Sequence, residues 1–224
     1  MKKLFAYFKH PTESIAKEDS ASIGSIILFY FLIQGLFILS VIPFVIAGIL
    51  PENEISNLKE LGLPFWVIAF IPPILEELAF RFSLKRRRIN FIVSFVVVCW
   101  FLLPKIIPVF PNLIYSPQYF WLRLSISVVL GLLLGYFLTP VLQKIRFEVV
   151  FYVFAFLFGF LHIFNYAIQI TSLIFVLYIL IYLLNKVVIG MLLGYIRVRY
   201  TIFGSIVAHL LNNFIPLLLV YYVS

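Results

Sequence analysis

Two adjacent carboxylates, Glu76 and Glu77, stand in a stretch of sequence that is otherwise suited to lipid. The stretch from 64 to 81 reads Pro-Phe-Trp-Val-Ile-Ala-Phe-Ile-Pro-Pro-Ile-Leu-Glu-Glu-Leu-Ala-Phe-Arg. A carboxylate in hydrocarbon costs about 2.5–3.5 kcal/mol on insertion scales, so each of them needs a functional reason. Two of the three histidines, His162 and His209, also lie in apolar segments. Two carboxylates and two imidazoles inside a membrane indicate a reaction centre.

Helical spacing gives the two glutamates different neighbours. Adjacent residues of an α-helix point about 100° apart, so only one of these carboxylates can face a reacting atom squarely. Glu77 and Arg81 are four residues apart on one helical face, where they can form an ion pair. Glu76 has no such local partner and stands beside a like charge in a medium of low dielectric, which suits a general base. We therefore expect Glu76 to be the base and Glu77 with Arg81 to support it.

Two further polar side chains share a face of the last apolar segment. His209 and Asn213 are four residues apart, so one helix can present both to one point and form a donor pair for the charge that develops on a carbonyl oxygen. His162, from a third segment, can complete either water activation or metal binding. Phe158, four residues before His162, is expected to pack against it and orient it.

Three short patterns follow one another along the chain: E-E-x-x-x-R at 76–81, F-x-x-x-H at 158–162 and H-x-x-x-N at 209–213. In this order, each on an apolar helix, they resemble the CPBP family, which comprises the CAAX prenyl endopeptidases and the bacteriocin-processing and self-immunity (Abi) proteins. The resemblance implies hydrolysis of a peptide bond. It implies that Glu76 and His162 activate a water, and that His209 and Asn213 stabilise the tetrahedral oxyanion.

The resemblance covers 76–213, and the chain departs from the family pattern at two places. Only one predicted span precedes the first motif, fewer than the family would have. About 76 residues separate Arg81 from Phe158, enough for two additional helices. Because an added pair of spans restores the direction of the chain, the helix that carries His162 keeps its orientation.

The sequence leaves two mechanisms open for these residues. Glu76, His162 and His209 could hold a zinc-like divalent ion, with water in the fourth position. The sequence contains no H-E-x-x-H motif, and the candidate ligands are spread over three helices. We therefore slightly favour a metal-free mechanism in which a glutamate activates the water.

Composition predicts an all-α, polytopic transmembrane bundle. Hydrophobic residues make up 64% of the chain, charged residues 12%, and the mean hydropathy is +1.13. Since lipid offers backbone groups no partners, apolar runs of about 20 residues must be helices. We expect a cytoplasmic juxtamembrane segment at 1–22 and one membrane domain at 23–224. We expect seven spans, with Asn185 and Lys186 as a point where the sixth could break; the spans are 23–50, 64–84, 89–110, 120–142, 148–168, 171–196 and 203–222.

The net charge of +8 is explained by orientation rather than by nucleic-acid binding. With a cytoplasmic N-terminus, twelve basic residues fall in inside segments and only Lys59 falls outside, as the positive-inside rule requires. This bias predicts that the C-terminus is outside. The twelve are Lys2, Lys3, Lys9, Lys17, Lys85, Arg86, Arg87, Arg88, Lys144, Arg146, Arg197 and Arg199.

Three functional readings compete. The leading one is an intramembrane endopeptidase of a bacterial plasma membrane, whose substrates are membrane-associated peptides or protein tails such as bacteriocin leaders, signalling peptides or prenylated tails. The second is a non-catalytic membrane adaptor, which would not need Glu76, His162, His209 and Asn213 together. The third is a proton-coupled transporter, and no inverted internal repeat supports it.

Overall fold

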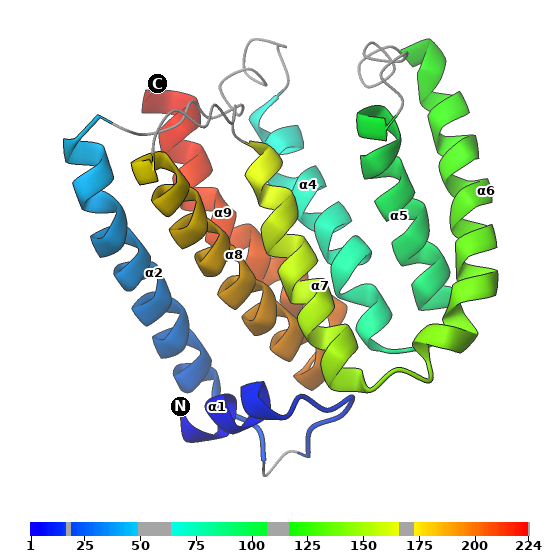
Figure 1. Cartoon of the computed structure of the whole chain (residues 1–224), viewed down its shortest axis with the longest axis horizontal. Helices are drawn as coiled ribbons and strands as arrows, with labels where there is room; N and C mark the ends of the chain where they lie inside the picture. The colour runs from blue at the N-terminus through cyan, green and yellow to red at the C-terminus, as the bar shows by residue number, and fades with distance from the viewer. Residues whose placement is uncertain (17–18, 49–63, 107–116, 166–172, 224) are drawn as a thin grey trace.

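The computed structural model describes residues 1–16, 19–48, 64–106, 117–165 and 173–223, and within these ranges the chain forms helices and no strand (Figure 1). The α-helices and the two short 3₁₀ helices, η1 and η3, have the following bounds: α1 (Lys2–Lys9), α2 (Ile23–Ile46), α4 (Phe65–Phe80), η1 (Phe82–Leu84), α5 (Arg88–Ile106), α6 (Pro117–Leu142), α7 (Phe147–Leu161), η3 (His162–Asn165), α8 (Leu173–Arg199) and α9 (Ile202–Val223).

The all-helical class is confirmed for the described residues. Among the described residues, three helices are long and apolar enough to cross a membrane: α2, α6 over Tyr119–Leu142, and α8. In α5, α7 and α9 the apolar stretches are shorter, over Arg88–Pro104, Phe147–Leu161 and Ile202–Phe214. Each predicted span contains an α-helix, but the number of spans stays a prediction.

Two features of the helices differ from a simple reading of their sequences. Pro72 and Pro73 lie inside α4 without ending it, as is tolerated where neighbouring helices satisfy the freed backbone groups. The expected break at Lys186 is wrong, because α8 is continuous over Leu173–Arg199. Neither Asn185 nor Lys186 removes a backbone donor, and the Asn185 amide bonds to Gln34 of α2 at 3.4 Å.

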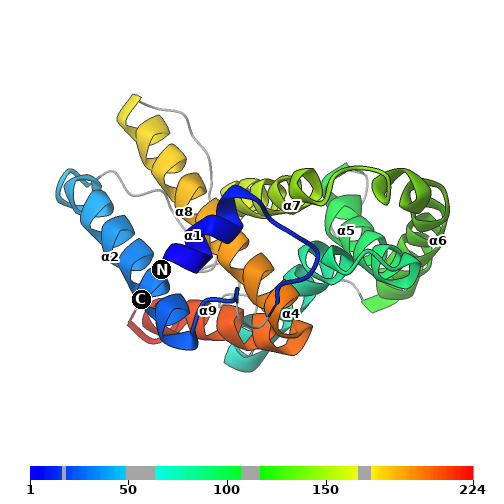
Figure 2. The same ribbon diagram turned by 90° about the horizontal axis from the view of Figure 1, so that it is seen from below.

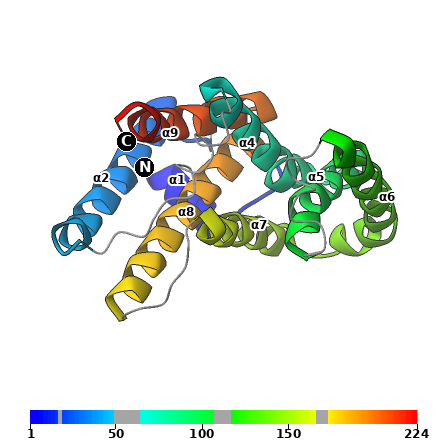
Figure 3. The same cartoon turned by 90° about the horizontal axis from the view of Figure 1, so that it is seen from above.

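The helices are arranged as a long bundle. Seen from below and from above, α5 and α6 form one end of the bundle and α2 lies toward the other (Figures 2 and 3). Between them α4 packs against α9, and α7 packs against α8. At the α5–α6 contact, a Cβ at Gly131 would lie 2.6 Å from the backbone nitrogen of Val96, so the missing side chain permits this close approach. The residues expected to do chemistry lie in α4, in α7 with η3, and in α9, and α8 packs against α7 and α9.

The N-terminal helix α1 packs beneath the bundle (Figure 2). Leu4 is fully buried, and the Tyr7 ring lies 5.0 Å from that of Tyr195 in α8 and 5.6 Å from that of Phe151 in α7. The described part of the segment at 1–22 therefore shares the core of the helices that it precedes.

The basic residues gather at one end of the bundle. The connections from α4 to α5, from α6 to α7 and from α8 to α9 all lie at the lower end in Figure 1, together with α1. They carry Lys85, Arg86, Arg87, Lys144 and Arg146. These basic residues, which the sequence predicts to lie on one side of a membrane, are thus found at one end of the bundle.

Candidate active site

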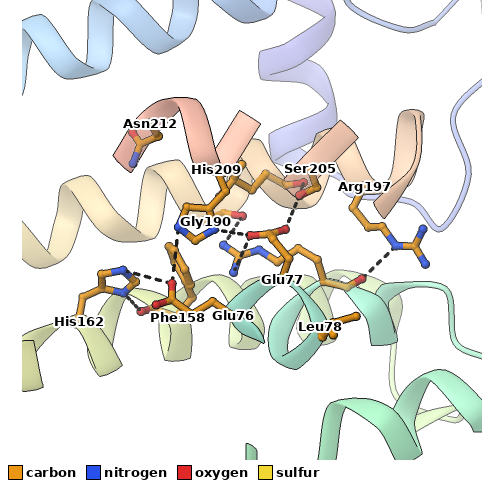
Figure 4. A network of polar contacts seen from close by, with 12 residues as sticks. Glu76, Glu77, Leu78, Phe158, His162, Gly190, Arg197, Ser205, His209 and Asn212 are labelled. Carbon is orange, nitrogen blue, oxygen red and sulfur yellow. Dashed lines mark hydrogen bonds and ion pairs between the residues drawn. The ribbon is translucent and has the colours of Figure 1, made fainter. Parts of the chain in front are cut away.

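The described structure brings three of the four expected catalytic residues together (Figure 4). Glu76 lies near the end of α4, His162 begins η3 directly after α7, and His209 lies in the first half of α9. Glu76 Oε2 is 3.6 Å from His162 Nε2 and 3.5 Å from His209 Nε2. The Glu76 side chain is 21% exposed, whereas that of His209 is 1% exposed. Glu76 is therefore the most exposed member of the triad, although its Oε2 atom, which faces the two histidines, is itself buried.

The hydrogen bonds of the Nδ1 atoms fix how the two imidazole rings face Glu76. His162 Nδ1–H donates to the Phe158 carbonyl oxygen at 2.7 Å, and His209 Nδ1–H donates to Glu77 Oε1 at 2.9 Å. Both acceptors lack hydrogens, so in each neutral imidazole the proton is on Nδ1 and Nε2 is an acceptor. Three acceptor atoms then face one another, and neither Glu76 Oε2 nor His209 Nε2 has a hydrogen-bond partner among the described residues. Such a cluster is suited to a cation, or to water and a proton.

Glu77 holds His209 in place from the side opposite Glu76. It is fully buried and forms the predicted ion pair with Arg81, with 3.6 Å between Oε1 and Nη1. The Ser205 hydroxyl donates to Glu77 Oε2 and also lies 3.1 Å from the Leu193 carbonyl oxygen. A carboxylate that orients the imidazole of a site is a frequent supporting device.

Arg81 ties the supporting pair to the neighbouring helices. Its guanidinium lies 3.8 Å from the centre of the Phe158 ring, and Nη2 donates to the Gly190 carbonyl oxygen at 3.4 Å. The same Phe158 ring lies 4.4 Å from the ring of His162, as expected for a residue that orients it. In addition, Arg197 Nε of α8 donates to the Arg81 backbone carbonyl oxygen at 3.2 Å. The end of α4 is thereby held by α8.

Asn213 hydrogen-bonds to a neighbour on its own helix. It follows His209 by one helical turn, and its Oδ1 accepts a hydrogen bond from Asn212 Nδ2 at 2.8 Å. Asn212 Oδ1 in turn accepts from Gln34 Nε2 at 2.6 Å. The expected clamp of His209 and Asn213 is therefore divided: His209 faces Glu76, whereas Asn213 has its oxygen occupied and keeps its two amide hydrogens.

Two residues of the site were missed from the sequence as participants. Ser205 forms a buried hydrogen bond with Glu77, and no regular spacing in the sequence indicates this contact. Lys186 was read as a possible helix break, although a lysine within a predicted span is itself a signal of function. It interacts electrostatically with Glu76 and His162.

The triad fits a divalent metal ion. Ligand atoms about 2.0–2.2 Å from a tetrahedral zinc stand about 3.3–3.6 Å from one another. The two distances from Glu76 Oε2, 3.6 and 3.5 Å, agree with this, and all three ligand atoms lie within 4.8 Å of one another. The bonds at Phe158 and Glu77 leave both Nε2 atoms free to coordinate. Glu76, His162 and His209 would be the three protein ligands.

No protein-family model, no curated protein and no solved structure matches this chain.

Proposed function

We propose that this chain is an intramembrane endopeptidase of the CPBP type, which hydrolyses membrane-associated peptides or protein tails. The observation that carries this proposal is the position of the Glu76 carboxylate between Nε2 of His162 and Nε2 of His209. These side chains come from different helices, and a purely structural contact would pair donors with acceptors. A site that places acceptors against one another is suited to holding a water that is to lose a proton.

Glu76 is the group that takes the proton. A water within reach of Glu76 Oε2 loses its proton to the carboxylate as its oxygen adds to the carbonyl carbon of the substrate peptide bond. When the C–N bond breaks, Glu76 returns the proton to the leaving nitrogen. One water is consumed, and the products are a carboxylic acid and an amine.

The remaining residues orient the reactants. Glu77 and the Phe158 carbonyl keep both imidazoles turned with Nε2 toward the water. Asn213 keeps its amide N–H groups because its oxygen is occupied, and we assign stabilisation of the oxyanion to it. His209 contributes less to that role than the family resemblance implies, since the tautomer with its proton on Nδ1, bonded to Glu77, has no hydrogen on Nε2 to donate. In the alternative mechanism, a divalent ion held by Glu76, His162 and His209 would supply Lewis-acid polarisation and a more acidic water, in place of base catalysis by Glu76.

The position in the membrane is part of the proposal. We propose seven spans, a cytoplasmic N-terminus and an external C-terminus in a bacterial plasma membrane. The collection of basic residues at one end of the bundle supports this orientation. In such a membrane, peptide maturation or self-immunity is favoured over processing of prenylated tails.

Peptide cleavage in membranes tests this function. The chain is co-expressed with secreted and lipidated peptides, and fragments are compared for wild type, Glu76→Ala and the exposed-site control Glu13→Ala. We expect cleavage by wild type and by the control, and none by Glu76→Ala. Equal fragment patterns from wild type and Glu76→Ala would favour the non-catalytic adaptor.

A further inference from the structure

Lys186 is a cation in the middle of a membrane helix. It lies thirteen residues from both Leu173 and Arg199, the ends of α8. Its ammonium lies 5.4 Å from the centre of the Tyr182 ring, which gives it a weak cation–π contact. A charge at such depth is costly, so it requires an anion or a functional reason.

The helical turn around Lys186 packs against the site. In α7, a Cβ at Gly159 would lie 2.9 Å from the backbone nitrogen of Val187 and 3.3 Å from the Leu183 carbonyl oxygen. Gly159 is one turn before His162. One turn after Lys186, Ile189 packs in the cluster that contains Phe158. This packing places the turn of α8 that carries Lys186 against the part of α7 that leads into His162.

No acidic side chain pairs closely with Lys186. Among the described residues it has no carboxylate within 4.0 Å and donates no hydrogen bond, and the sequence has no Asp or Glu after Glu148. Glu77 is held by Arg81 and His209. The ammonium therefore stands beside the triad with its hydrogen-bonding capacity unused.

We infer that Lys186 binds a carboxylate group of the substrate, close to the bond that is cut. The carboxylate can be the free C-terminus of a peptide or an Asp or Glu side chain, because an ammonium recognises both. This inference rests on the proposed peptidase function, and it predicts a preference for anionic substrates. A carboxylate would complete the coordination of the ammonium, and the Tyr182 ring would cover its other side.

Matched peptides test the inference on the purified full-length protein in lipid nanodiscs. A set of apolar peptides is made with a free C-terminus, with an amidated C-terminus, and with an amidated C-terminus plus one Glu in place of Gln. For wild type we expect kcat/KM to be roughly 10- to 100-fold higher for one carboxylate-bearing form than for the neutral form. In Lys186→Met this ratio should fall to about 1, and Lys186→Arg should restore part of it. The exposed-site control Lys144→Met should keep the wild-type ratio.

Binding separates this inference from the proposed function. Peptide affinities are measured for Glu76→Gln and for Glu76→Gln combined with Lys186→Met, so that no turnover is needed. We expect the first protein to bind the carboxylate form more tightly, and the second to lose that preference. If wild type cleaves nothing, the proposed function fails, and the affinities still decide on Lys186. Equal affinity for acid and amide forms, or an equal loss for all forms in Lys186→Met, would overturn the inference.

Discussion

At the scale of single residues, the hydrogen-bond partner of each histidine Nδ1 determines what the imidazole can do. Glu77 and the Phe158 carbonyl accept from Nδ1, and both Nε2 atoms are therefore turned toward Glu76. In this arrangement Glu76 faces Nε2 of both histidines, whereas Glu77 faces only Nδ1 of His209. The arrangement also makes a bound cation as suitable for the centre as the metal-free chemistry that the sequence slightly favours, because either a cation or a water with a proton would satisfy three acceptors.

Exchanging each glutamate for glutamine should separate their roles. Glu76→Gln removes proton acceptance with little change of shape, so activity per folded protein should fall by at least about 10²-fold. Glu77→Gln leaves Arg81 uncompensated in a fully buried site, which should destabilise the fold by about 3–5 kcal/mol and lower the amount of protein. Peptide cleavage normalised to folded protein measures both effects. If Glu77→Gln abolishes normalised activity and Glu76→Gln does not, the two roles are reversed.

Zinc uptake should depend on His162. We expect the purified protein to bind about one zinc per chain, and free zinc at 100 times its Kd to stabilise the fold by about 2.7 kcal/mol. His162→Ala should lose most of this affinity, whereas His10→Ala, at an 81% exposed side chain, should not. Elemental analysis and thermal unfolding give the readouts. Zinc stoichiometry unaffected by His162→Ala would point to a different site, and no uptake at all would return the choice to the metal-free mechanism.

At the scale of helices, glycines set the separations on which the site depends. Gly159 brings α7 against the backbone of α8, and Gly131 brings α6 against that of α5. The contact at Gly159 is one turn from His162. The contact at Gly131 lies between α5 and α6, which carry none of the triad residues. The same kind of packing thus has different consequences in the two places.

A methyl group at each glycine should reveal this difference. Gly159→Ala would place a Cβ 2.5 Å from Val187 Cγ2, so α7 must shift and His162 with it. We expect about 1–3 kcal/mol of destabilisation together with lower activity per folded protein. Gly131→Ala should destabilise by a similar amount without lowering that normalised activity. Gly35→Ala, with no atom within 4 Å of its Cβ, serves as control. Equal loss of normalised activity in the first two variants would contradict this division.

At the scale of the whole molecule, the distribution of charge gives the bundle two different ends. Described connections rich in Lys and Arg share one end with α1. A substrate that approaches along the basic end would meet positive charge first. The proposed preference of Lys186 for a carboxylate would likewise favour anionic substrates.

Labelling should confirm the sidedness of the bundle. Cys99 is buried, so Cys99→Ser provides a background for single cysteines. A cysteine at exposed Lys144 should react with an impermeant reagent only after the membrane is opened. A reporter fused after Ser224 should be active outside the cell, as the charge bias requires. A cytoplasmic reporter signal would overturn the odd number of spans.

The sequence by itself determined the helical class, the approximate bounds of the helices and the residues that could do chemistry. Hydropathy locates apolar helices because lipid leaves the backbone no other partner. The cost of charge in lipid makes Glu76, Glu77, His162 and His209 conspicuous. The spacing of four residues was sufficient to predict the ion pair between Glu77 and Arg81, since residues four apart lie on one face of a helix.

Only the tertiary structure decided which atoms meet. His209 lies between Glu76 and Glu77, Ser205 holds Glu77, and Asn213 turns its oxygen to Asn212. These contacts join residues more than one hundred positions apart or depend on how α9 is rotated, and helical periodicity contains neither. The place of Lys186 beside the triad likewise follows from the packing of α8 on α7, where glycine permits close approach.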